Sequence, residues 1–313
     1  MPKWTARKWD TSDIPDQSGR TVLVTGANSG LGLRTAEVLA GRGAHVVLAC
    51  RSAERGQRAL EQVLATGGKA ELVSLDLADL SSVRAAAALV RERTGDALDV
   101  LVNNAGLMAV PLGRTADGFE RQFGVNHLGH AALTWLLMPA LRTRPGARVV
   151  TVSSLVHQMG HLDLADPNYE VRRYTAWGAY GQSKLANLLF ARELDRRTRA
   201  AGVDVTSVAA HPGVSATELS ANTAAAYRNP LYRIGLKIGD VFAQSVEVGA
   251  LPQLYAATSP KAEPGGYYGP DGFRETRGHP APAASTTAAR DELAAARLWD
   301  LTAKLTGVAP DPS

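Results

Sequence analysis

The sequence predicts an α/β protein in which helices cover both faces of one mainly parallel sheet. Short runs rich in β-branched residues alternate with helical patterns along most of the chain. The first of these runs leads through a glycine-rich turn directly into a helical pattern. No change in composition divides the 313 residues, of which 45% are hydrophobic, so we expect a single large domain.

The glycine-rich turn predicts a dinucleotide site. A β-branched run over residues 20–25 ends in TGANSGLG, and a helical pattern follows over residues 33–41. Gly26 permits a tight turn, Gly30 lets the backbone approach a pyrophosphate, and Gly32 lets helix and strand pack closely. The helix N-terminus adds N–H donors and the positive end of a dipole. This pattern predicts a doubly wound Rossmann-type fold, with cofactor contacts at Gly26, Asn28, Ser29, Gly30 and Leu31.

The second predicted strand, residues 44–50, decides which dinucleotide is expected. NAD-binding sites place an acidic residue near this strand end, roughly 20 residues beyond the glycine turn. Here Cys50 and Arg51 occupy that point. A guanidinium can bind a 2′-phosphate through two hydrogen bonds, whereas a carboxylate would repel it. Arg51 therefore predicts NADP(H), although an arginine at a strand end can also be purely structural.

Strands and helices continue to alternate toward the C-terminus. We expect strands over residues 69–74, 98–102, 148–153 and 204–209, and helices over residues 53–65, 81–93, 117–141, 179–197, 245–257 and 291–305. Residues 265–272 are rich in turn formers with room for a short strand, and residues 280–289 resemble a low-complexity connector. The last helix is amphipathic, with one apolar side formed by Leu293, Leu298, Leu301 and Leu305.

Polar and small residues follow the third and fourth predicted strands, where a parallel sheet binds its ligands. Asp76 can accept a hydrogen bond from an adenine amino group, or it can be an ordinary loop residue. Asp79 or Ser81 is the better candidate to cap the next helix. The small residues of Asn103-Asn104-Ala105-Gly106 let the backbone pass close under a ribose. The expected cofactor contacts here are Asp76, Leu77, Asn103, Ala105 and Gly106.

Tyr180 and Lys184 lie four positions apart in the predicted helix over residues 179–197, so they share one face. A fixed cation beside a tyrosine stabilises the phenolate and lowers the tyrosine pKa toward neutrality. The same spacing is also typical of an exposed helix face. Asn126 is a polar residue within an apolar helical pattern, which costs stability and favours a functional role.

Taken together, these motifs resemble the short-chain dehydrogenase/reductase superfamily. TGANSGLG, NNAG, Asn126, Ser154, YGQSK and HPGV occur in the order typical of that superfamily, over roughly residues 18–306. ACR after the second strand, GVNHLGH, the long stretch between Ser154 and Tyr180, and GGYYGPDG are similar to its retinol dehydrogenase-like branch.

The resemblance implies catalytic roles for Tyr180, Lys184, Ser154 and Asn126. Tyr180 would exchange a proton with the substrate oxygen, as an acid in carbonyl reduction and a base in alcohol oxidation. Lys184 would hold the nicotinamide ribose and lower the pKa of Tyr180. Ser154 would bind the substrate oxygen, with Ser153 as the neighbouring alternative, because alternate side chains of a strand end point to opposite faces. Asn126 would bend its helix and hold a water that links Lys184 to solvent.

The resemblance also assigns the segments after the sixth strand. The turn His211-Pro212-Gly213-Val214 would hold the nicotinamide carboxamide, through Pro212, Gly213, Val214 and Thr217. Residues 215–240 occupy the place of a substrate lid. Its apolar residues Tyr227, Leu231, Tyr232, Ile234 and Leu236 would line the pocket or anchor the lid. The opposing wall would contain Met159, Leu162, Tyr169 and Trp177, which indicates a bulky hydrophobic substrate.

No second chemistry is indicated by the other polar residues. His211 precedes a proline in a turn, and we interpret it as structural, together with His127, His130, His157 and His161. Cys50 is the only cysteine, and no His or Cys spacing is typical of a zinc site, so we expect no metal. The 34 basic and 30 acidic residues form no basic block, so nucleic acid is not an expected partner.

No membrane or export signal is apparent in the sequence. The first 19 residues lack the apolar core of a signal peptide, and the apolar stretch over residues 131–141 is shorter than the ~20 residues that span a bilayer. Animal retinol dehydrogenases usually carry an N-terminal anchor, which we do not find here. We therefore expect a soluble, cytoplasmic protein with no integral membrane segment. Trp4 and Trp9 are expected to pack back onto the domain.

These observations define the expected organisation. Residues 1–17 form an N-terminal arm, residues 18–306 one Rossmann-type catalytic domain that includes the lid, and residues 307–313 a tail. The family resemblance implies a homodimer or homotetramer that pairs the helices over residues 117–141 and 179–197 across a two-fold axis.

The expected activity is NADP(H)-dependent interconversion of a carbonyl and an alcohol in a small-molecule substrate. One alternative is a sugar-nucleotide epimerase or dehydratase, which usually spaces its glycines as G-x-x-G-x-x-G and has a larger C-terminal domain. Another is a non-catalytic NADP(H) sensor, which would be expected to lack the tyrosine, lysine or serine.

Overall fold

Eight strands form one sheet in the order β3-β2-β1-β4-β5-β6-β7-β8. In this computed structural model the described residues are 8–214 and 244–312. Neighbouring strands are parallel except for the antiparallel pair β7 and β8. The expected mainly parallel, doubly wound sheet is confirmed. The strands are β1 Thr21–Thr25, β2 His45–Cys50, β3 Lys69–Ser74, β4 Val100–Asn103, β5 Ala147–Val152, β6 Val205–Ala210, β7 Tyr267–Pro270 and β8 Pro280–Pro282.

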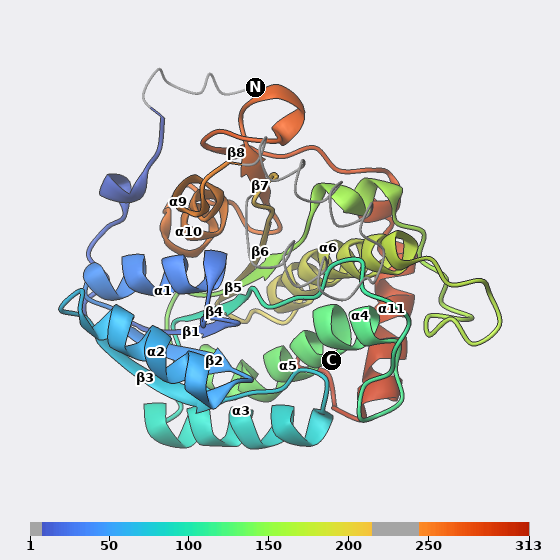
Figure 1. Cartoon of the computed structure of the whole chain (residues 1–313), viewed down its shortest axis with the longest axis horizontal. Helices are drawn as coiled ribbons and strands as arrows, with labels where there is room; N and C mark the ends of the chain where they lie inside the picture. Colours follow the sequence, from blue (N-terminus) through green and yellow to red (C-terminus); the bar gives the residue numbers. More distant parts are fainter. Residues whose placement is uncertain (1–7, 215–243, 313) are drawn as a thin grey trace.

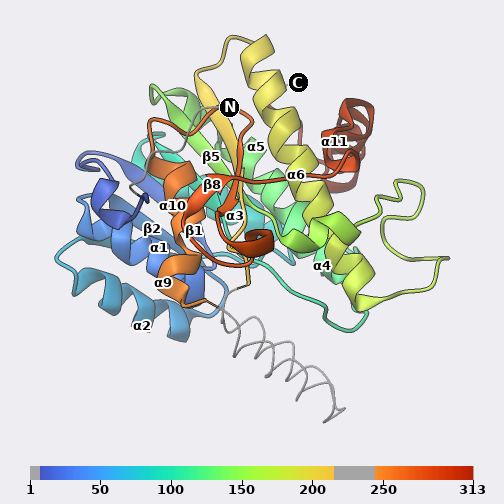
Figure 2. The same ribbon diagram turned by 90° about the horizontal axis from the view of Figure 1, so that it is seen from above.

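Helices cover both faces of this sheet, as Figures 1 and 2 show. One face carries α1 (Gly30–Gly41), α2 (Ala53–Leu64) and α10 (Leu251–Thr258), with the short α9 (Val246–Gly249) against α1. The other face carries α3 (Leu80–Thr94), α5 (Gly129–Arg142) and α6 (Ala176–Ala200). The C-terminal helix α11 (Glu292–Thr306) lies outside α6 and α5. Both faces are therefore buried, which explains why the central strands are apolar throughout.

Alternation along the strands divides the interior into two cores. In β4, Val100 and Val102 point into the core beneath α1 and α10, whereas Leu101 points toward α3 and α5. In β1, Val22 and Leu23 divide between the same two cores, and all these side chains are at most 1% exposed. The hydrophobic effect therefore fixes the register of the central strands, because a slip of one residue would exchange the two cores.

The strand order reverses between β1 and β4, which are hydrogen-bonded neighbours. The chain runs from β1 outward to β3 and then crosses back to β4. At such a reversal the loops leave the two strands in opposite directions, so a crevice opens beyond their carboxyl ends. This topology determines where the site of this protein lies.

The helix predicted over residues 117–141 differs from the structure. A single turn of helix α4 (Arg121–Phe123) leads into a π-helical turn, Gly124–Leu128, and then into α5. Glu120 begins this segment, since its carboxylate accepts the backbone N–H groups of Gln122 and Phe123. The prediction began the helix too early and did not include the π turn, a feature that often marks functional sites.

Two further predictions near the C-terminus are wrong. The segment predicted as a connector over residues 280–289 contains β8, which pairs with β7 at the edge of the sheet, where proline is tolerated. The helix predicted over residues 245–257 is divided at Ala250 into α9 and α10. Pro252 lies in the first turn of α10, where a missing N–H leaves no hydrogen bond broken.

Helix α11 covers the outer face of α5 and α6. Trp299 is 1% exposed, stacks on Phe190 of α6 at 5.3 Å between ring centroids, and meets Trp135 of α5 edge-on at 4.8 Å. Leu298 is buried as expected, whereas Leu293 is 73% exposed, so the predicted apolar side of this helix is wrong at its first turn. A two-fold pairing through this face of α5 and α6 would have to displace α11.

The N-terminal arm also packs on the body of the protein. The ring of Trp9 meets Tyr255 of α10 edge-on at 5.3 Å, and its carbonyl oxygen accepts a hydrogen bond from His279. The predicted packing of Trp9 is confirmed, whereas Trp4 lies outside the described residues.

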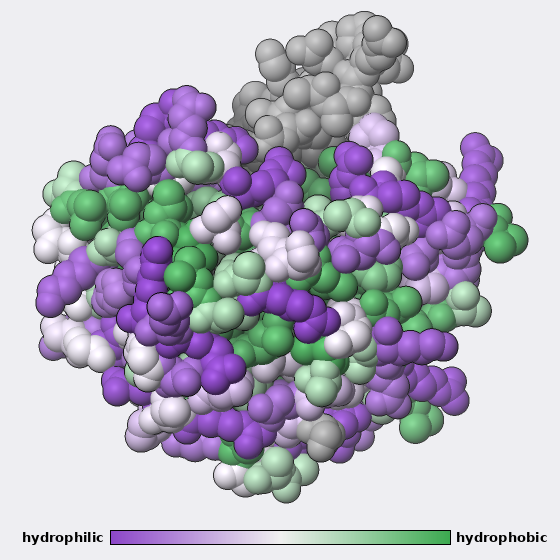
Figure 3. All heavy atoms as spheres, turned by 90° about the horizontal axis from the view of Figure 1, so that it is seen from below, coloured by the Kyte–Doolittle hydropathy of each residue, from purple (hydrophilic) through white to green (hydrophobic). Residues whose placement is uncertain are grey.

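The described surface is mixed in polarity. On the face that Figure 3 shows, hydrophobic residues are interspersed with hydrophilic ones. Among residues 8–214 and 244–312, no helix has the length and apolar character needed to cross a membrane.

Trp299→Ala should lower the free energy of unfolding by about 3–5 kcal/mol, because it leaves a cavity between α11, α5 and α6. Urea denaturation followed by circular dichroism measures this loss. Leu293→Ala on the same helix is the control and should change stability by less than about 0.5 kcal/mol, since Leu293 is 73% exposed. Equal losses in the two variants would contradict the packing described for α11.

Candidate active site

A cavity of about 990 Å³ extends along the carboxyl ends of the strands on both sides of the β1 and β4 pair. Its walls come from the loops after β1, β2, β3, β4, β5 and β6 and from the start of α6. Sequence segments nearly 190 residues apart, from Gly26 to Val214, meet around it. Of the residues predicted as cofactor contacts, those that line it are Gly26, Asn28, Ser29, Gly30, Leu31, Arg51, Asp76, Leu77, Ala105, Gly106, Tyr180, Lys184, Pro212, Gly213 and Val214.

The glycine turn has the close packing that a dinucleotide site requires. Gly26 has a φ of +65°, which disfavours any residue with a side chain. A Cβ atom on Gly32 would lie 2.4 Å from the carbonyl oxygen of Gly26, so helix α1 can approach the turn only with glycine at this position. Helix α1 begins at Gly30, and its first N–H groups face the cavity wall formed by Asn28, Ser29 and Leu31.

Arg51 lies at the end of the cavity beyond β2, with its side chain exposed. Ser52 and Arg55, which were not predicted, also line this end. The Ser52 hydroxyl accepts the backbone N–H of Arg55 and so caps α2. Arg55 could have been predicted from the sequence, because it is a second basic residue four positions after Arg51. The two arginines give this end the positive charge that a phosphate group requires.

The polar residues after β3 divide their roles as expected. Asp76 lines the cavity, and its Oδ1 accepts the N–H of Ala78 at 2.9 Å. Asp79 caps α3 by accepting the N–H groups of Ser81 and Ser82, and its pKa is lowered chiefly by its hydrogen bonds with Ser81.

The NNAG segment presents a different asparagine from the one predicted. Asn103 is buried, and its amide donates to Thr134 of α5 at 3.0 Å, so it is not among the cavity residues. Asn104 lines the cavity instead, and its amide donates to the Thr25 carbonyl oxygen at 2.8 Å. Successive residues at a strand end point to opposite faces, which accounts for the exchange.

Ser154, Tyr180 and Lys184 meet at the centre of the cavity. Ser154 follows β5, and its side chain is hydrogen-bonded to Tyr180 of α6. The Ser153 hydroxyl instead donates to the Lys184 carbonyl oxygen at 2.8 Å, so only Ser154 is placed against Tyr180. Lys184 is 4% exposed, and its Nζ donates to the Val152 carbonyl oxygen at 3.1 Å.

Burial controls the pKa values of this pair. It raises the pKa of Tyr180 to about 12, which the Ser154 hydrogen bond only partly offsets. Burial also lowers the pKa of Lys184 to about 8, because the ammonium loses its hydration. The predicted lowering of the Tyr180 pKa by Lys184 is therefore not seen. Lys184 Nζ lies 5.8 Å from the centre of the Tyr180 ring, and burial and the Ser154 hydrogen bond are the influences that set the pKa of the phenol.

Asn126 lies in the π-helical turn, completely buried behind the cavity wall. Its Oδ1 accepts the Leu107 N–H at 2.7 Å, and its Nδ2 donates to the Leu107 carbonyl oxygen at 2.9 Å. The same Nδ2 donates to Ser183 Oγ at 2.9 Å, and Ser183 lies next to Lys184 in α6. The side chain of Asn126 thus connects the loop after β4 to the helix that carries Tyr180 and Lys184.

The turn after β6 is held by residues outside the predicted motif. Gly213 has a φ of +67°, and Gln244 donates to the Pro212 carbonyl oxygen. His211 is 1% exposed, and its Nε2 is hydrogen-bonded to the Glu275 carboxylate at 3.1 Å, consistent with its predicted structural role. Thr217 and the predicted lid, including its five apolar residues, lie outside the described residues.

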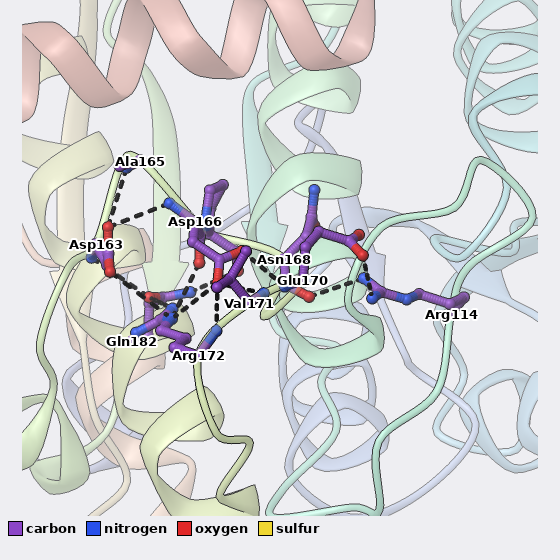
Figure 4. A network of polar contacts seen from close by, with 10 residues as sticks. Arg114, Asp163, Ala165, Asp166, Asn168, Glu170, Val171, Arg172 and Gln182 are labelled. Atoms are coloured by element: carbon purple, nitrogen blue, oxygen red, sulfur yellow. Dashed lines mark hydrogen bonds and ion pairs between the residues drawn. The ribbon is translucent and has the colours of Figure 1, made fainter.

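The segment between Ser154 and Tyr180 is fixed by polar contacts, which Figure 4 shows. Asp166 accepts the backbone N–H groups of Glu170, Val171 and Arg172, and Arg172 forms a hydrogen bond with Gln182 of α6. Arg114, in the loop before α4, pairs with Glu170 at 3.0 Å. These contacts join the loop that contains Arg114 to the segment between Ser154 and Tyr180.

Only part of the predicted apolar wall faces the cavity. Trp177 lines it, whereas Tyr169 is buried against Tyr174 and Met159 is 75% exposed. The apolar side chains that line this end are Leu107, Met108, Val110, Leu155, Val156 and Trp177. In the part of the chain that the structure describes, no group of three or more His, Cys, Asp and Glu residues is arranged to hold a metal ion.

Comparisons with known proteins identify the family. Residues 20–228 match the family model of the short chain dehydrogenases. Human retinol dehydrogenase 13 is 41% identical over 296 residues, which cover 93% of this chain and 85% of that protein. Mouse polyprenol dehydrogenase is 42% identical over 301 residues, covering 94% and 86%. A crystal structure of an uncharacterized protein from Mycobacterium paratuberculosis has a TM-score of 0.79 at 42% identity, covering 96% of this chain and 98% of the other.

The fold and the site thus define an oxidoreductase of the type that binds a nicotinamide dinucleotide. The chain belongs to the short chain dehydrogenase family and is a retinol dehydrogenase-like member of it.

Proposed function

We propose that this protein is an NADP(H)-dependent oxidoreductase that interconverts a carbonyl and an alcohol on a bulky hydrophobic substrate. The observation that carries the proposal is the meeting of Ser154, Tyr180 and Lys184 in one cavity with a glycine turn and Arg51. The lysine and the tyrosine are both buried, so the exchange of a proton with a bound substrate is shielded from bulk water.

NADP(H) would supply or accept the hydride in this reaction. The close-packed glycine turn and the N-terminus of α1 would hold its pyrophosphate, while Arg51 and Arg55 would hold its 2′-phosphate. Asp76, Asn104 and the backbone of Ala105 and Gly106 line the cavity between the two ends, where the adenosine and ribose groups would lie.

The proton would pass through Tyr180. In carbonyl reduction the phenol donates its proton to the substrate oxygen, which Ser154 holds by a hydrogen bond, and Lys184 stabilises the resulting phenolate. In alcohol oxidation the phenolate accepts the hydroxyl proton. Tyr180 is protonated at neutral pH, since burial raises its already high pKa to about 12, and it can therefore act as the acid in reduction.

The substrate class follows from the cavity wall and the relatives. Leu155, Val156 and Trp177 form an apolar surface beside Tyr180. The names of two relatives, a retinol dehydrogenase and a polyprenol dehydrogenase, refer to long hydrophobic alcohols. We propose an alcohol or carbonyl compound with an extended apolar group as the substrate.

The predicted division into an arm, one catalytic domain with a lid, and a tail is kept as part of this proposal. A homodimer or homotetramer and a cytoplasmic location also stay predictions. Light scattering of the purified protein measures the assembly. If a dimer forms with α11 in place, it must use a face other than the one α11 covers on α5 and α6.

Tyr180→Phe should reduce turnover by at least about 10³-fold, since it removes the proton donor, while the dissociation constant for NADPH stays nearly unchanged. Lys184→Ala should weaken both turnover and NADPH binding. Turnover is measured as loss of NADPH absorbance with a panel of apolar ketones and aldehydes, and binding by fluorescence titration. A Tyr180→Phe variant that kept most of its turnover would refute the assigned proton donor. NADPH binding without turnover of any substrate would favour a sensor.

Arg51→Asp should raise the Michaelis constant for NADPH by about 10- to 100-fold and leave that for NADH unchanged or lower, because a carboxylate repels the 2′-phosphate. Arg58→Asp is a suitable control. Arg58 lies in α2, the helix that follows Arg51, and its side chain is exposed. It pairs with Glu54 at 2.8 Å and does not line the cavity. An unchanged cofactor preference in Arg51→Asp would exclude Arg51 as the phosphate ligand.

Reduction should lose kcat/KM as the pH rises through about 8, because the pKa of Lys184 is lowered to about 8 and the uncharged amine cannot stabilise the phenolate. Alcohol oxidation should instead accelerate with rising pH up to about 8, since the pKa of Tyr180 is about 12 and its phenolate is scarce at neutrality, and should level off where Lys184 loses its charge. Steady-state rates between about pH 6 and 10 measure both limbs. Lys184→Arg, which stays charged throughout this range, should not show the alkaline loss in reduction. An alkaline loss that persists in this variant would assign it to another group.

A further inference from the structure

His130 bridges two parts of the site that lie far apart in the sequence. It lies in the first turn of α5, four residues after Asn126, and is 2% exposed. Its Nε2 lies 2.9 Å from the hydroxyl of Thr25, the last residue of β1. Its Nδ1 lies 3.0 Å from the backbone carbonyl oxygen of Asn126.

The partners of His130 define its tautomer. A carbonyl oxygen can only accept, so Nδ1 must carry the proton that is donated to Asn126. The Thr25 hydroxyl already accepts the N–H groups of Asn104 at 2.9 Å and Ala105 at 3.0 Å, which occupy both of its lone pairs. It must therefore donate its own proton, and the nearer acceptor is Nε2 of His130, at 2.9 Å compared with 3.3 Å for the Val102 carbonyl oxygen.

The charged form of His130 does not fit this arrangement. A second ring proton on Nε2 would point at the hydroxyl proton of Thr25. The Lys184 ammonium also disfavours a positive charge on the His130 ring. A charge on His130 would in turn disfavour one on His127 of the same turn. Burial lowers the pKa of His130 to about 4, so the ring stays neutral over the working pH range.

The bridge holds the loop after β4 from two sides. Thr25 fixes the loop through the N–H groups of Asn104 and Ala105, at the cavity wall. The side-chain amide of Asn126 fixes the loop again at Leu107, because it accepts the Leu107 N–H and donates to the Leu107 carbonyl oxygen. His130 joins these two anchors, so Thr25, His130, Asn126 and the loop form a closed circuit of hydrogen bonds.

We propose that His130 is a positioning residue for hydride transfer. As the neutral Nδ1–H tautomer it fixes the separation between the end of β1 and the π turn, and thereby the loop that lies under the cofactor and the Asn126 amide that contacts Ser183. This role rests on the proposed function of the site. It goes beyond the structural role predicted for His130, because it acts on the geometry of the reaction.

The tautomer is tested directly by nitrogen NMR of the protein with ¹⁵N-labelled histidine. The resonance of His130 is assigned by its absence from the spectrum of His130→Phe. We expect Nδ1 to be protonated and Nε2 to be bare from about pH 5.5 to 8.5. A proton on Nε2, or titration within this range, would overturn the proposal. This measurement requires no substrate, so it tests the tautomer of His130 even if the protein reduces no carbonyl compound.

His130→Phe tests the consequence for the reaction. The phenyl ring fills the space but forms neither hydrogen bond, and we expect kcat to fall by about 10- to 100-fold, because small displacements of a reacting group reduce the rate steeply. NADPH affinity should fall about 3- to 10-fold, through the loosened loop. Thr25→Val removes the hydroxyl at nearly constant shape and also leaves the N–H groups of Asn104 and Ala105 without their acceptor, so it should lower kcat and NADPH affinity at least as much as His130→Phe. Thr25→Ser keeps the hydroxyl and should retain most of the activity.

His127→Phe is the matched control. His127 lies in the same π turn and is 1% exposed, but its Nε2 contacts Thr302 of α11, on the side away from the cavity. Its replacement removes the buried hydrogen bonds to Thr302 and to Asn187 of α6, neither of which lines the cavity, and should lower the melting temperature at least as much as His130→Phe, with kcat and NADPH affinity nearly unchanged. Equal kcat in the two histidine variants would overturn the positioning role. If neither the wild type nor any variant reduced a carbonyl compound, the difference in NADPH affinity between the two variants would still decide it.

Discussion

The structure depends on the hydrogen-bonded pairing of β1 with β4, where the order of the strands reverses. This one pairing brings the glycine turn after β1 against the NNAG loop after β4, and the reversal opens the cavity between them. The pairing is secured by burial on both faces, because Val22 and Val102 fill one core while Leu23 and Leu101 fill the other. The site therefore lies at the end of two strands that are buried on both faces.

Burial also sets the pKa values of Tyr180 and Lys184. Tyr180 and Lys184 are almost completely removed from water, and the loss of hydration moves their pKa values in opposite directions, up for the phenol and down for the ammonium. The result is an uncharged tyrosine beside a lysine that is mostly charged at neutral pH. Ser154 contributes a hydrogen bond to the same phenol, so the three side chains act as one unit.

The polar contacts behind the cavity have a different role from those that line it. Asn126, Thr25 and His130 do not reach into the cavity, yet they hold the loop that forms its floor. The network around Asp166 does the same for the opposite wall. The first set is fully buried, whereas the second includes exposed residues such as Glu170, whose side chain is 62% exposed. Several hydrogen bonds in each set restrict movement of the loops.

The sequence by itself determined the strand and helix order, the glycine turn and the positions of Tyr180, Lys184 and Ser154, because these depend on local periodicity, on turn geometry and on a spacing of four in a helix. The tertiary structure decided which asparagine faces the cavity, the π turn at Asn126, the edge strand β8 and the position of α11 over Trp135 and Phe190. Each of these depends on contacts between segments distant in the chain. The same is true of the pKa of Tyr180, since burial is a property of the whole fold that no spacing of residues reports.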